Sequence, residues 1–155
     1  MLNRKIDSYL KNYYQKSSNA LLITGARQVG KTYSIREFGK TFKSFIEINF
    51  IENPDVVGLF KDAKGSADIL MRLSIITNVP MIKGDTLIFF DEIQECPDIV
   101  TAIKFLVDEG SYRYILSGSL LGVELKDIRS VPVGYMGVKE MFPLDFEEFI
   151  TCVGI

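Results

Sequence analysis

The chain has 155 residues, of which 47% are hydrophobic, and a formal net charge of -2. This length and apolar content suffice for one domain with a core and exclude a disordered chain. The slight acidity gives no basic footprint, so nucleic-acid binding is not indicated. Two cysteines and no histidine exclude a His/Cys zinc site by count, and nothing in the sequence suggests a disulfide framework.

The N-terminal region predicts a helix and then a buried strand. Residues 2–16 place apolar side chains at helical spacing, which indicates a leading helix within residues 1–18. It lacks the apolar segment of a signal peptide, and no run in the chain is long enough to cross a bilayer. We therefore expect a cytoplasmic protein without a membrane span. Residues 20–24 form a short apolar run that predicts the first strand, at the start of a core over residues 19–155.

The segment after this strand has the spacing of a phosphate-binding P-loop, Gly-x-x-x-x-Gly-Lys-Thr over residues 25–32. Its glycines permit backbone angles that turn successive N–H groups toward a phosphate, at the positive end of the next helix. Lys31 is expected to reach the β- and γ-phosphates, and the Thr32 hydroxyl to ligate Mg²⁺. Arg27 and Gln28 are expected to offer backbone only. The predicted nucleotide-binding residues are Gly25, Ala26, Arg27, Gln28, Val29, Gly30, Lys31, Thr32 and Tyr33.

The next elements are predicted from periodicity. We expect a helix over residues 31–38 that ends near Gly39, a strand over 43–49 and a short helix that starts near Pro54. A longer helix over 67–77 should bury one face. The residues expected on that face are Ile69, Leu70, Leu73 and Ile76.

A second candidate site element is the apolar run 86–90, which ends in Asp91-Glu92. A run that is apolar on both faces predicts a central parallel strand, whose carboxyl end faces the ligand crevice of an α/β sheet. Asp91 would then hold Mg²⁺, and Glu92 would orient or deprotonate the attacking water. The alternative is a solvated acidic pair that opens a loop.

A helix over 97–109 and a strand over 112–116 follow, and Gly110 should end the helix. The strand leads into Ser117-Gly118-Ser119, so Ser117 or Ser119 is a candidate for a γ-phosphate sensor. An ordinary Ser-Gly turn is the alternative interpretation. The helix is expected to bury Val100, Ile103, Phe105, Leu106 and Val107.

The C-terminal part predicts a polar helix over 121–129, a fifth strand over 136–141 and a final helix over 143–149 capped by Asp145. Alternation of strands and helices predicts an α/β fold, with a mostly parallel five-stranded sheet between two helical layers, an αβα sandwich.

Taken together, the motifs resemble a family of AAA-like P-loop ATPases of the additional-strand class. The resemblance rests on residues 23–32, 87–94, 116–119 and 142–149. It implies Walker A and Walker B motifs, ATP and Mg²⁺ as ligands, and hydrolase activity. It is also compatible with a homo-oligomer. Members of that family typically continue into a C-terminal domain, so we expect the chain to be an N-terminal part of a longer protein.

One departure concerns the family's Gly-Arg pair before the fifth strand, where this chain has Gly134-Tyr135. Arg129 is a weak substitute for the missing arginine. Because an arginine finger contributes about 10³–10⁵ in turnover, hydrolysis is expected to be slow in isolation.

The expected function is Mg²⁺-dependent ATP hydrolysis coupled to a conformational change. The absence of an Asn-Lys-x-Asp motif favours ATP over GTP. An ATP-binding switch or scaffold with little intrinsic hydrolysis is the alternative. A small-molecule kinase is less consistent with the sequence, because no arginine-rich lid segment is present.

Overall fold

The computed structural model describes residues 5–26, 30–119 and 134–142. These residues form a sheet of five parallel strands in the order β2-β3-β4-β1-β5, flanked by helices. The strands are β1 (Ala20–Thr24), β2 (Ser44–Asn49), β3 (Thr86–Asp91), β4 (Arg113–Gly118) and β5 (Met136–Glu140). The helices are α1 (Lys5–Lys16), α2 (Lys31–Gly39), η1 (Pro54–Val56), α3 (Val57–Phe60), α4 (Ser66–Ile76), η2 (Ile93–Glu95) and α5 (Asp98–Glu109). The α/β class and the five-stranded parallel sheet are confirmed.

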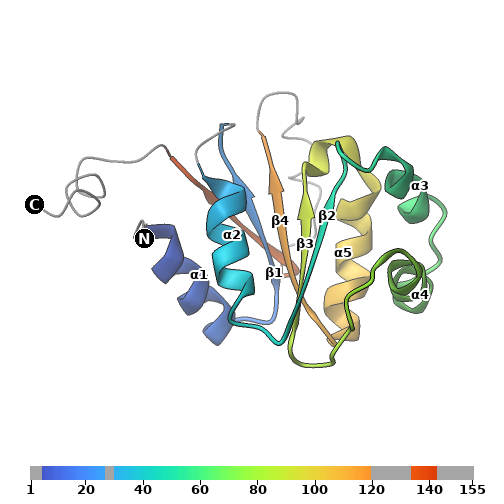
Figure 1. Cartoon of the computed structure of the whole chain (residues 1–155), viewed down its shortest axis with the longest axis horizontal. Coiled ribbons are helices and arrows are strands. Elements are labelled where there is room, and N and C mark those ends of the chain that lie inside the picture. The colour runs from blue at the N-terminus through green and yellow to red at the C-terminus, as the bar shows by residue number, and fades with distance from the viewer. Residues whose placement is uncertain (1–4, 27–29, 120–133, 143–155) are drawn as a thin grey trace, which may run out of the picture.

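The strands are apolar on both faces because helices cover both faces of the sheet. Along β3, Leu87 and Phe89 pack into a cluster with α1 and α2, whereas Ile88 and Phe90 pack into a second cluster with α3, α4 and α5. Figure 1 shows these two helical layers on opposite sides of the sheet. All four side chains are fully buried, and burial of each contributes about 1.5–3 kcal/mol.

The strand order brings the two predicted phosphate-site strands close together without making them neighbours. Strand β4 pairs with β1 on one side and with β3 on the other. This is the additional-strand arrangement that the resemblance implied. Because all five strands are parallel, their carboxyl ends lie along one edge of the sheet, where α/β folds bind ligands.

Helix α1 is fastened to the sheet by two tyrosine hydroxyls. The Tyr14 hydroxyl donates a hydrogen bond to the backbone oxygen of Tyr114. The Tyr13 hydroxyl donates to the Ala20 oxygen at 2.7 Å and accepts from the Gly137 N–H at 3.2 Å. Burial raises the pKa of Tyr14 well above its usual range, so its hydroxyl remains a donor. The other buried side chains of α1 are Ile6 and Leu10.

For two side chains, the prediction of burial in the core is wrong. Ile76 is 38% exposed and Phe105 is 42% exposed. Ile76 is the last residue of α4, three positions after the buried Leu73. Phe105 lies on a helix whose apolar residues outnumber the positions on one face, and its neighbours Ile103 and Leu106 occupy the buried side.

The remaining elements match the predicted order with small shifts at their ends. The predicted helices 121–129 and 143–149, with Asp145, lie outside the described residues. Among the helices that the structure describes, none combines the length and hydropathy needed to cross a membrane.

Candidate functional site

The turn from β1 into α2 has the backbone that its glycines permit. Gly25 has φ +149° and Gly30 has φ +92°. Both lie where a Cβ would be strained, and Gly30 is the N-cap of α2. The Lys31 ammonium donates to the Gly25 oxygen at 2.7 Å and to the Ala26 oxygen at 2.8 Å, so it folds back over the turn. Three predicted site residues, Arg27, Gln28 and Val29, lie outside the described part.

The structure brings Thr32 and Asp91 together. The Thr32 hydroxyl, in the first turn of α2, donates to Oδ2 of Asp91 at 3.2 Å. Asp91 is the last residue of β3 and stands in register with Asn49 of β2 and Ser117 of β4. A hydroxyl and a carboxylate are oxygen ligands of the kind that Mg²⁺ prefers.

Asp91 lies in an environment that disfavours its charge. Its side chain is buried, with the whole residue 5% exposed. Burial is the largest cause that raises its pKa, and the negative charge of Glu92 raises it further. The hydrogen bonds from Thr32 and from the Glu92 N–H act in the opposite direction without cancelling these effects. A cation at this carboxylate would compensate for both.

Glu92 has a left-handed backbone, with φ 59° and ψ 49°. This conformation is uncommon for a residue with a Cβ and often occurs at functional sites. Its N–H donates to Oδ1 of Asp91 at 2.9 Å. Its carboxylate accepts a hydrogen bond from the side-chain amide of Gln94, to which the sequence analysis assigned no role.

The two candidate sensor serines differ in their surroundings. Ser117 is fully buried, pairs in register with Asp91, and its hydroxyl oxygen has no hydrogen-bond partner within the described residues. Ser119 is also buried, at 3% exposure, but lies beyond the end of β4 and has a polar interaction. A buried hydroxyl without a partner is unfavourable for folding alone. This property distinguishes Ser117 from Ser119.

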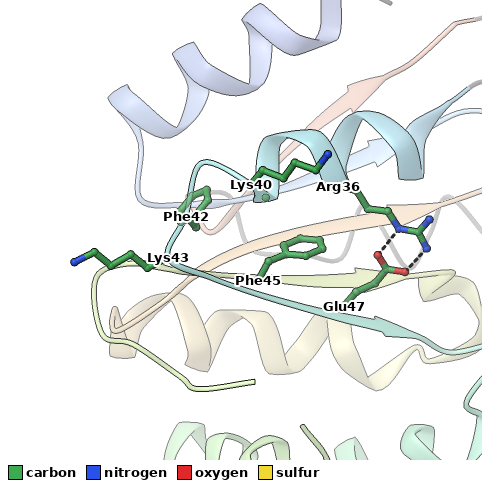
Figure 2. Close-up of a pocket in the computed structure, with 7 residues that line it drawn as sticks. Arg36, Lys40, Phe42, Lys43, Phe45 and Glu47 are labelled. Atoms are coloured by element: carbon green, nitrogen blue, oxygen red, sulfur yellow. Dashed lines mark hydrogen bonds and ion pairs between the residues drawn. The ribbon is translucent and has the colours of Figure 1, made fainter. Parts of the chain in front are cut away.

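Tyr33 is 48% exposed, so its side chain is not packed in the core. One turn further along α2, Arg36 donates two hydrogen bonds of 2.7 Å to the carboxylate of Glu47 on β2. Figure 2 shows this pair beside a shallow surface pocket of about 490 Å³ between α2 and β2. None of the predicted nucleotide-site residues lines it. The lining residues are Arg36, Gly39, Lys40, Phe42, Lys43, Phe45 and Glu47.

Other kinds of site receive no support from the residues that the structure describes. They contain no group of three or more His, Cys, Asp or Glu side chains that would hold a metal ion alone. The Cys96 thiol is buried, and burial raises its pKa to about 11, so it stays protonated and unreactive.

Comparison with known protein families matches residues 17–150 to the AAA domain family. A comparison with curated proteins found no match. The matched segment covers all five strands, the Lys31 turn and the Asp91-Glu92 pair. The match indicates a nucleotide-binding, ATPase-like function, and the chain belongs to the AAA domain family.

Proposed function

We propose that this chain binds ATP with Mg²⁺ and hydrolyses it, and that hydrolysis drives a conformational change in an attached domain or partner. The observation that carries the proposal is the 3.2 Å contact between the Thr32 hydroxyl and Asp91. The contact joins the start of α2, which follows the P-loop, to the carboxyl end of β3. Nucleotides bind at this edge of the sheet in α/β folds.

The residues present fit a magnesium–nucleotide complex in three respects. Thr32 and Asp91 offer two adjacent oxygen ligands. The Lys31 side chain already lies over the turn, where its ammonium donates hydrogen bonds to two backbone oxygens. A bound phosphate would accept hydrogen bonds from the ammonium in their place. The buried Ser117 hydroxyl lacks a partner in the described part of the chain, and a phosphate oxygen or the attacking water would supply one.

In the proposed reaction, the turn's N–H groups and Lys31 bind the phosphates, while Thr32 and Asp91 hold the metal ion. Mg²⁺ supplies charge neutralisation on the phosphate oxygens when it is bound. Glu92 accepts a proton from the attacking water. The water oxygen bonds to the γ-phosphorus, the bond to the bridging oxygen breaks, and ADP and phosphate leave. Ser117 donates its hydroxyl hydrogen to the γ-phosphate or orients the water.

A nucleotide-dependent switch with little intrinsic hydrolysis is the second candidate. The observation that favours it is Tyr135, which occupies the place of the arginine of the resembling family. Arg129, the substitute, lies outside the described residues. Phosphate release in a single turnover, with and without candidate partners, separates the two functions.

The substitution Glu92→Gln tests the proposal. The amide keeps the size of the side chain but cannot accept the proton, so ATP binding should persist while turnover falls at least about a hundredfold. Glu95→Gln, at an exposed acidic residue of the same turn, is the matched control and should keep full turnover. Unchanged turnover in Glu92→Gln would remove Glu92 from the reaction, and a wild-type protein that binds ATP without turnover would favour the switch.

A further inference from the structure

We propose that Gln94 is a positioning residue that holds the Glu92 carboxylate in place for hydrolysis. The inference rests on the proposed function, because it gives Glu92 a reaction to serve. Gln94 is the middle residue of η2, the short helix that begins directly after Glu92. Its side chain is half-buried, although it lies only two residues after Glu92 at the sheet edge.

The first observation is the contact between the two side chains. Nε2 of Gln94 donates to Oε2 of Glu92 at 2.5 Å. Within residues 30–119 it is the one hydrogen-bond donor recorded for this carboxylate. The contact also fixes the orientation of the amide, because the opposite orientation would set an oxygen against a carboxylate. The amide N–H therefore restricts where the Glu92 carboxylate lies.

The second observation is that the side chain of Gln94 lies against the end of β4. A Cβ added at Gly118 would lie 3.1 Å from Oε1 of Gln94 and 3.0 Å from Cγ1 of Ile93. The glycine thus leaves room for η2 to pack closely on the strand end that carries Ser117. Through this packing, Gln94 connects the carboxylate of Glu92 to the candidate sensor strand.

The third observation is that folding does not account for the amide. Oε1 of Gln94 is buried and has no hydrogen-bond partner in the described part of the chain. A buried acceptor without a partner destabilises a fold, and an apolar side chain of the same length avoids that penalty. A glutamine that serves only packing would therefore be replaceable by methionine without loss. A positioning role predicts the opposite for turnover.

The test separates these roles with two substitutions that act from different elements. Gln94→Met keeps the length of the side chain and removes its donor. It should keep or raise the melting temperature and leave the KM for ATP unchanged, while kcat falls by about tenfold to a hundredfold, as expected for a displaced catalytic group. Gly118→Ala should lower kcat by displacing Gln94, and should lower it little further when combined with Gln94→Met. Glu95→Ala, on the exposed side of the same turn, is the control and should leave kcat unchanged.

The outcomes are distinguishable when wild type, Glu92→Gln and the Gln94 variants are measured side by side on the whole chain. Normal or faster turnover in Gln94→Met, with Glu92→Gln inactive, would overturn the role of Gln94 and leave the proposed function intact. A raised KM with unchanged kcat would overturn it as well, since Gln94 would then serve binding. Full turnover in Glu92→Gln would remove both.

Discussion

Thr32 and Asp91 are separated by 59 positions in the sequence, yet the hydroxyl of one donates to the carboxylate of the other at 3.2 Å. The contact arises because α2 begins beside the carboxyl end of β1, and β4 alone separates β1 from β3. Folding therefore places the hydroxyl against a buried carboxylate whose charge its surroundings disfavour. A divalent cation would relieve this electrostatic cost, and several consequences can be measured.

The first prediction concerns Asp91→Asn. Because the pKa of Asp91 is raised in the folded protein, the folded state holds this proton more tightly than the unfolded state. Its contribution to stability is therefore largest at low pH and is lost as pH rises from about 4 through the folded pKa. Without Mg²⁺ at pH 7, Asp91→Asn should melt at the same temperature as wild type or higher. The melting temperature of the variant relative to wild type should rise as pH increases from about 4 through the folded pKa of Asp91.

Addition of Mg-ATP should reverse the order of the two proteins. At a concentration of a hundred times Kd, a ligand stabilises the protein that binds it by about 2.7 kcal/mol. The variant, which lacks the charged metal ligand, should gain much less. Thermal melts from pH 4 to 8, with and without Mg-ATP, provide the measurement. A variant that is less stable at every pH and equally stabilised by Mg-ATP would contradict this assignment of Asp91.

The second prediction separates the two serines. Ser117→Ala removes a buried hydroxyl without a partner among the described residues, so stability should be unchanged or rise by up to about 1 kcal/mol. Turnover should nevertheless fall by about a hundredfold, the usual cost of one donor to a developing charge. Ser119→Ala is the matched control and should keep its turnover. The reverse pattern in phosphate-release assays would transfer the sensor role to Ser119.

The third prediction uses two buried tyrosines with opposite expectations. Tyr14→Phe loses the hydrogen bond to the Tyr114 backbone and should destabilise the fold by about 1 kcal/mol. Tyr114→Phe removes a buried hydroxyl that has no partner within the described residues and should be neutral or stabilising. Urea denaturation of both variants measures the difference. Equal losses would show that the hydroxyl at position 114 is satisfied in solution.

The fourth prediction tests the packing of α2 on β2. A Cβ at Gly39 would lie 2.4 Å from Cδ1 of Phe45, whose ring stacks on Phe89. Gly39→Ala should therefore cost about 1–3 kcal/mol through overpacking. Gly58→Ala in α3 is the control, because nothing lies within 4 Å of a Cβ there. It should stabilise by about 0.5–1 kcal/mol through helix propensity. A stable Gly39→Ala would mean that the Phe45 ring moves aside freely.

Much of the fold was predictable because its signals are local. Continuous apolar runs predicted β1 and β3, since strands covered on both sides need no polar face. Gly30 and Gly110 predicted where α2 begins and α5 ends, and both have the left-handed backbone that favours glycine. The fixed spacing of the P-loop predicted the positions of Lys31 and Thr32, although the binding roles of these residues remain predictions.

The features that were missed depend on contacts between distant segments. Gln94 lies close to Gly118 because η2 packs against the end of β4, and the hydrophobic periodicity of the sequence does not predict this packing. The exposure of Phe105 likewise depends on which side of α5 packs into the core, where Ile103 and Leu106 are fully buried. That Ser117 and not Ser119 lies beside Asp91 follows from the register of β3 against β4, which a turn sequence does not contain.

The family match begins at residue 17, after the end of α1. Yet Leu10 and Tyr14 pack against the strands, and two hydroxyl anchors join this helix to strands from both ends of the described chain. A protein trimmed to the matched segment would uncover a broad apolar surface over β1 and α2, and such surfaces promote aggregation. We therefore expect α1 to fold together with the matched segment that follows it, and truncations should retain residues 5–16.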